Sequence, residues 1–98
     1  MNITQKATGE QLILEIEGRI DTKTAPSLET VIQTALEGIR SLVIDLAETV
    51  YISSAGLRVI LMAQKQMNRQ GDMKVIHVSS DLMDIFEVTG FADILTIE

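Results

Sequence analysis

The run Leu42-Val43-Ile44-Asp45-Leu46 constrains the fold more than any other segment of the chain. Its nearly continuous apolar character is typical of a central strand that is covered on both faces of a mostly parallel sheet. Apolar residues at helical spacing precede it: Leu28, Val31, Ile32, Ala35 and Leu36. This spacing predicts an amphipathic helix, capped by Thr22 or Thr24, with Pro26 in its first turn and Gly38 after its end.

The remaining segments alternate between strand and helix patterns. We expect strands at Asn2 to Lys6, at Leu12 to Ile16 (ended by Gly18), at Met73 to Val78 and at Ile94 to Ile97. We expect a loop from Ala47 to Ser53, a helix from about Ala55 to Arg69 before Gly71, and a helix from Ser79 or Ser80 through Val88 before Gly90. The order is β-β-α-β-α-β-α-β, which predicts a single α/β domain over residues 1–98, with a mixed, mostly parallel sheet and right-handed crossovers.

Composition narrows the class of protein. The chain has 98 residues, 46% of them apolar and only 3% aromatic, so we expect an aliphatic core. The net charge of -6 argues against a nucleic-acid partner, which needs a basic surface. No apolar run approaches the roughly 20 residues of a membrane span, and no signal peptide is visible. We therefore expect a cytoplasmic protein with no nucleic-acid or membrane partner.

The residues that usually carry catalysis are scarce. His77 is the only histidine, it falls within a predicted strand, and there is no cysteine. There is no second histidine for a metal-binding pair, no thiolate ligand is available, and no phosphate-binding loop or dinucleotide fingerprint is present. We expect no catalytic residue, no metal and no cofactor.

The segment Ser53-Ser54-Ala55-Gly56-Leu57-Arg58 places two hydroxyls directly before a predicted helix. A serine there can cap the helix, or it can carry a phosphate where the helix N-terminus favours negative charge. Asp45 ends the central strand and is expected at the same sheet edge as these serines. For Asp45 and for Asp21, which follows the second strand, hydrogen bonding to loop N–H groups is favoured over a chemical role.

One face of the predicted helix after Ser54 is basic in an acidic chain. Its residues follow i, i+4, i+7 and i+11 spacing: Arg58, Met62, Lys65 and Arg69. An exposed methionine among charges suits an adaptable contact surface. A solvated stripe with one partly buried methionine explains the same pattern, and the sequence leaves both alternatives open.

Four segments together resemble the STAS domain family, and within it the bacterial anti-sigma factor antagonists. They are Gly18-Arg19-Ile20-Asp21 with Thr24-Ala25 downstream, Leu42 to Leu46, Tyr51 to Leu57, and Val88-Thr89-Gly90-Phe91. The resemblance covers essentially the whole chain. It implies that Ser54, two residues before the glycine, is the phosphorylated serine. Ser53 stands in place of the family's aspartate and is the second candidate for the phosphate.

The resemblance implies a regulatory protein and not an enzyme. The unphosphorylated form would bind an anti-sigma factor, itself an ATP-dependent serine kinase of the GHKL type, and so free a sigma factor. Phosphorylation of Ser54 would separate the two proteins, and a metal-dependent serine phosphatase would restore binding. The expected partner-binding residues are Asp21, Ser53, Ser54, Arg58, Met62, Lys65 and Arg69.

Two other functions within the same family stay open. The chain can be an accessory STAS subunit of a lipid-transport ATPase, in which the same loop and helix form a permanent contact. It can also be a ligand-sensing module with a pocket near Asp21 and Ser54. A small enzyme is disfavoured because no nucleophile and base pair is found.

Overall fold

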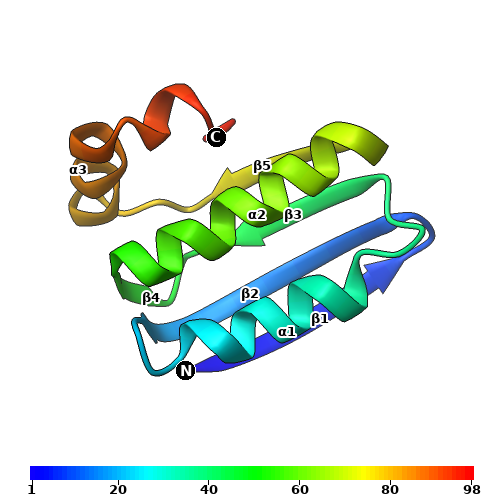
Figure 1. Ribbon diagram of the computed structural model, residues 1–98, viewed down its shortest axis with the longest axis horizontal. Coiled ribbons are helices and arrows are strands. Elements are labelled where there is room, and N and C mark those ends of the chain that lie inside the picture. The colour runs from blue at the N-terminus through cyan, green and yellow to red at the C-terminus, as the bar shows by residue number, and fades with distance from the viewer.

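A computed structural model describes residues 1–98, and it has a five-stranded sheet with two helices lying on one face (Figure 1). The elements are β1 (Asn2–Thr8), β2 (Gln11–Ile20), α1 (Ala25–Ala35), β3 (Ser41–Asp45), β4 (Thr49–Ile52), α2 (Ser54–Gln70), β5 (Asp72–Ile76), α3 (Ser80–Thr89) and the 3-10 helix η1 (Phe91–Asp93). Strands β1, β2, β3 and β5 follow one another across the sheet, and β4 pairs with β2. Only β1 is antiparallel to its neighbour. The predicted α/β fold with a mixed, mostly parallel sheet is confirmed.

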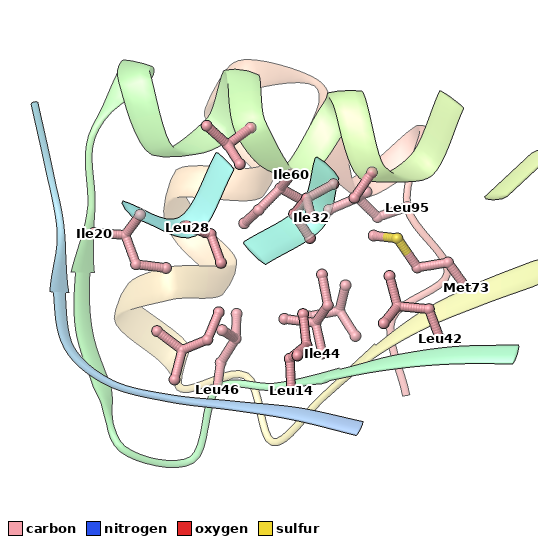
Figure 2. Close-up of a cluster of buried hydrophobic side chains, with 14 of the residues drawn as sticks. Leu14, Ile20, Leu28, Ile32, Leu42, Ile44, Leu46, Ile60, Met73 and Leu95 are labelled. Atoms are coloured by element: carbon pink, nitrogen blue, oxygen red, sulfur yellow. The ribbon is translucent and has the colours of Figure 1, made fainter. Parts of the chain in front are cut away.

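The core lies between the sheet and helices α1 and α2 (Figure 2). Strand alternation turns Leu12, Leu14 and Ile16 of β2 toward the helices, and all three are buried. Apolar stripes of the two helices meet them, with Leu28 and Ile32 from α1 and Ile60, Ala63 and Met67 from α2. In β3, Leu42, Val43 and Ile44 are all buried, as the unbroken apolar run predicts. The helix periodicity therefore identified the buried faces correctly.

Strand β2 does not end at Gly18, contrary to the sequence prediction. Its first half pairs with β3 from Gln11 to Glu15, and its end pairs with β4 from Gly18 to Ile20. The register shifts between Gly18 and Arg19, where Gly18 has a φ of 99° that side chains rarely adopt. The glycine thus permits a bulge and a change of partner strand, and the strand continues beyond it.

Strand β4 replaces most of the loop that was predicted from Ala47 to Ser53. A hydrogen bond from Thr49 stabilises its start: the buried Thr49 hydroxyl donates to the Ile16 carbonyl at 2.6 Å. The Gly18 N–H donates to the Glu48 carbonyl at 2.9 Å, which closes the same junction from the other side. Four residues are too few to show a strand periodicity, and it is the pairing with β2 that orders this segment as a strand.

The C-terminal part of the chain also differs from the prediction. No strand forms from Ile94 to Ile97: η1 ends just before this segment, which makes only a single bridge, between Val75 and Ile97. Ser79 caps α3 and Gly90 ends it in the left-handed conformation, as predicted. His77 lies just past β5 and not within it, with a φ of 58°.

Removing the Thr49 hydroxyl should destabilise the β2–β4 junction. Thr49→Val keeps the side-chain shape but leaves the buried Ile16 carbonyl without its donor, which should cost about 1–3 kcal/mol of unfolding free energy. Urea unfolding measures this. The control is Thr34→Val, because exposed Thr34 bonds only to its own helix and should change stability little. Equal effects of both substitutions would contradict the role given to Thr49.

Candidate functional site

The carboxyl ends of the parallel strands lie at one edge of the molecule, on the left in Figure 1, where α1 and α2 begin. The Ser53 N–H donates to the Ile20 carbonyl at 2.8 Å, so the start of α2 is attached to the end of β2. The segment after β2, which contains Asp21, and the segment before α2, which contains Ser53, are therefore neighbours. This edge is where crossovers of a parallel sheet gather functional residues.

Gly56 lets the first turn of α2 rest directly on the sheet. A Cβ at this position would lie 2.6 Å from Cγ2 of Ile20 and 3.0 Å from both the Ile20 carbonyl oxygen and Cγ2 of Ile52. The first distance is shorter than real Cβ contacts and the other two are tight, so a side chain here would force the helix or its neighbours in β2 and β4 to shift. The close approach fixes where the residues just before Gly56 stand.

The two serines have different roles in the structure. Ser53 is the N-cap of α2, and its side-chain oxygen accepts a hydrogen bond from the Gly56 N–H at 3.4 Å. Ser54 is the first helical residue, is exposed, and its hydroxyl makes no hydrogen bond within the chain. Ser53 therefore takes the capping role that the sequence left open between them, and the Ser54 hydroxyl is free to react.

This division of roles is testable by two alanine substitutions. Ser53→Ala should lower the unfolding free energy by about 0.5–2 kcal/mol, because the N-cap acceptor is lost. Ser54→Ala removes an exposed hydroxyl with no partner and should change stability by less than about 0.5 kcal/mol. Thermal unfolding of both variants measures the difference. A larger loss for Ser54→Ala than for Ser53→Ala would show that the assignment is reversed.

Asp21 is held by the turn that follows β2. Its Oδ1 accepts hydrogen bonds from the N–H groups of Lys23 at 3.0 Å and Thr24 at 3.1 Å. The bond from the Thr24 N–H lowers the pKa of the Asp21 carboxyl most; desolvation opposes it, and Lys23, the Thr24 hydroxyl and Arg19 add to it. The net result is a pKa below the usual value. The hydrogen-bonding interpretation of Asp21 is thus confirmed.

Thr24 is the N-cap residue of α1, yet its hydroxyl does not cap the helix. It accepts the Asp21 N–H at 2.8 Å and lies 2.8 Å from the Arg19 carbonyl, to which it can donate. The Thr24 N–H instead donates to the Asp21 carboxylate. The threonine predicted as a cap therefore braces the turn between β2 and α1.

Arg19 and Tyr51 form a contact beside the serines that the sequence did not predict. The two residues face each other across the β2–β4 pairing, and the Arg19 guanidinium lies 4.4 Å from the centre of the Tyr51 ring. Such a cation–π contact holds both side chains in place. Arg19 Nε also lies 3.7 Å from Asp21 Oδ2, so the contact links Tyr51 to the Asp21 turn.

A shallow groove of about 390 Å³ lies beside Ser54. One wall comes from the end of β4 and the start of α2, with Tyr51, Ile52, Ser53, Ser54 and Leu57. The other comes from α3, with Asp84, Ile85, Val88 and Thr89. We call this the Ser54 groove. Asp21 does not line it, so a pocket shared by Asp21 and Ser54 is not found.

Asp45 stands at the expected sheet edge but does not line the Ser54 groove. Its Oδ1 accepts the Ala47 N–H at 3.0 Å and lies 2.9 Å from Nδ1 of His77. Partial burial would by itself raise the pKa of the Asp45 carboxyl, but the Ala47 N–H, His77 and Lys6 outweigh it and leave the pKa below its usual value. Asp45 thus connects the β3–β4 turn to the segment before α3.

The basic face of α2 is only partly as predicted. Arg58, Lys65 and Arg69 are exposed, and none of them takes part in an ion pair. Met62 is half-buried and packs against the core cluster, which agrees with the second alternative, a solvated stripe with one partly buried methionine. The surface is therefore a row of three unpaired cations.

Comparison with known proteins places this chain in a family. The model of the STAS domain matches residues 2–98. The chain belongs to the STAS domain family. A STAS relative, the anti-sigma-B factor antagonist of Bacillus subtilis, is 31% identical over 98 residues, which cover 99% of this chain and 90% of the relative.

Solved structures agree on the fold. An anti-sigma factor antagonist from Mycobacterium paratuberculosis matches with a TM-score of 0.88 at 21% identity, over 98% of this chain and 83% of that one. Bacillus SpoIIAA in its phosphorylated form matches with a TM-score of 0.77 at 14% identity, over 99% and 91% of the two chains. None of the helices of this STAS domain combines the length and apolar composition needed to cross a membrane.

The sequence did not identify the α3 wall of the groove in this STAS domain. Val88 is 88% exposed, on a helix whose other exposed residues are all polar or acidic. A β-branched apolar residue has a low helix propensity and gains nothing from exposure to solvent. This unusual placement of Val88 was the one feature of the sequence that could have indicated the α3 wall. Asp84 gave no signal, because an exposed acid on a helix is ordinary.

Proposed function

We propose that this chain is an anti-sigma factor antagonist that is switched by phosphorylation of Ser54. The unphosphorylated form binds an anti-sigma factor of the GHKL serine kinase type and frees a sigma factor. The kinase phosphorylates Ser54 and the complex separates, and a metal-dependent serine phosphatase restores the binding form. The chain is a substrate and a switch, acts without a cofactor, and the cytoplasm is its expected location.

The observation that carries this proposal is the free, exposed Ser54 hydroxyl at the first position of α2. A kinase needs an accessible hydroxyl, and Ser53 already provides the cap, so reaction at Ser54 removes no hydrogen bond from the fold. Ser54 also lines an apolar groove in which a partner can dock. The name of the Bacillus subtilis relative supports the same function.

The structure can tolerate a phosphate at Ser54. Phosphorylation adds about -1.5 to -2 charges at neutral pH. The positive end of the α2 dipole and its free N–H groups favour that charge, and Arg58 stands one turn further along the same face. In the apolar groove, however, the phosphate is bulky and strongly hydrated. The switch therefore acts by blocking a surface and leaves the fold intact.

Kinase treatment tests the acceptor. The GHKL-type serine kinases of the source genome are incubated in turn with the chain and ATP, and phosphopeptides are mapped. We expect one phosphate, on Ser54, and none in Ser54→Ala, which should still bind. Ser80→Ala is a matched control, because Ser80 is also exposed at the first position of a helix capped by the preceding serine. Phosphate on Thr22 or Thr49 would overturn the proposal, and phosphate on Ser53 would move the acceptor by one residue.

We also propose that the exposed cations of α2, together with Asp21, Ser53 and Met62, belong to the partner-binding surface. Arg58→Glu should weaken kinase binding by about tenfold, since a charge reversal near the centre of an interface opposes docking. Lys6→Glu makes the same change in net charge on the edge strand β1, where Lys6 pairs with Glu15, and should have little effect. Titration of both variants against the kinase measures this. If Arg58→Glu binds the kinase as tightly as the control variant does, the interface lies elsewhere.

A further inference from the structure

Two helices of opposite charge border the Ser54 groove. Helix α2 contains Arg58, Lys65 and Arg69 and no acidic residue. Helix α3 contains Asp81, Asp84 and Glu87 and no basic residue. None of the six takes part in an ion pair within the chain. The α3 wall thus offers negative charge that the chain itself does not neutralise.

Asp84 is the only charged residue that lines the groove. Five of the nine lining residues are hydrophobic, among them Leu57 from α2 and Ile85 and Val88 from α3. Val88 is 88% exposed and Tyr51 is 37% exposed, so the groove presents apolar surface to solvent. A partner that covers this surface removes water from the Asp84 carboxylate as well.

Covering an unpaired carboxylate with apolar groups is strongly unfavourable, whereas covering it with a cation is not. We propose, resting on the function above, that the Ser54 groove takes an apolar side chain of the kinase partner, flanked by an arginine or lysine that pairs with Asp84. The apolar side chain packs on Leu57 and Val88, and the cation supplies the charge complementarity. The groove is thereby the specificity-determining part of the interface.

The same arrangement explains how phosphorylation acts. Ser54 and Asp84 line one groove of about 390 Å³, so a phosphate on Ser54 enters the volume that the partner's apolar side chain occupies. The phosphate keeps its water and brings a second anion next to Asp84. The apolar side chain then loses its place, although the fold is unchanged.

Charge reversal in the groove tests the proposal. Asp84→Lys should weaken binding of the cognate GHKL kinase by about tenfold or more. Glu87→Lys changes net charge equally on the same helix but outside the groove, and should stay within about twofold of wild type. Reversing one arginine or lysine of the kinase to glutamate should restore binding to Asp84→Lys. Circular dichroism confirms that the variants are folded.

A second pair of variants tests the apolar contact. Val88→Ser should weaken kinase binding by about fivefold or more, whereas Val50→Ser, at a position that is 66% exposed and outside the groove, should not. If Asp84→Lys binds the kinase as well as Glu87→Lys does, and Val88→Ser as well as Val50→Ser does, this inference is wrong while the proposed function stands. If the wild type binds none of the GHKL kinases, the proposed function and this inference fall together. If Val88→Ser instead dissociates a dimer of this chain, the groove is an interface between copies and the inference is wrong.

Discussion

The change of partner along β2 is the constraint on which the candidate site depends. The first half of β2 pairs with β3 and its end pairs with β4, and Gly18 takes the left-handed conformation where the register shifts. The Thr49 hydroxyl satisfies the Ile16 carbonyl at this irregular point. Strand β4 therefore extends beyond β3 along β2 and delivers Ser53 beside the Ile20 carbonyl. Without this junction the start of α2 would have no fixed position on the sheet.

Helix α2 packs into the core with one face and presents the candidate site with the other. Ile60, Ala63 and Met67 bury its inner face in the core, and Gly56 allows its first turn to rest on β2 and β4. Because the helix is held at both places, the exposed Ser54 stands at a defined position. Under the proposed function, a phosphate there would meet a helix N-terminus that favours anions, so its energetic consequence would fall on the partner and not on the fold.

Charge is distributed unevenly around the site in a chain with a net charge of -6. Unpaired cations lie on α2 and unpaired acids lie on α3, with an apolar groove between them. Exposed charges contribute little to stability in this arrangement. They are better understood through association, where complementary potentials select a partner and mismatched ones exclude others.

The sequence by itself determined the three α-helices and most of the strands, the inner faces of α1 and α2, and the ends of α2 and α3, because periodicity, capping residues and glycines act over a few residues. It did not determine strand β4 or the passage of β2 through Gly18, since both depend on pairing between segments distant in the chain. The division of roles between Ser53 and Ser54 and the burial of Met62 were likewise decided by packing. The Ser54 groove exists only in the tertiary structure: Leu57 and Val88 come from helices that follow different strands, and the fold alone brings their side chains to one surface.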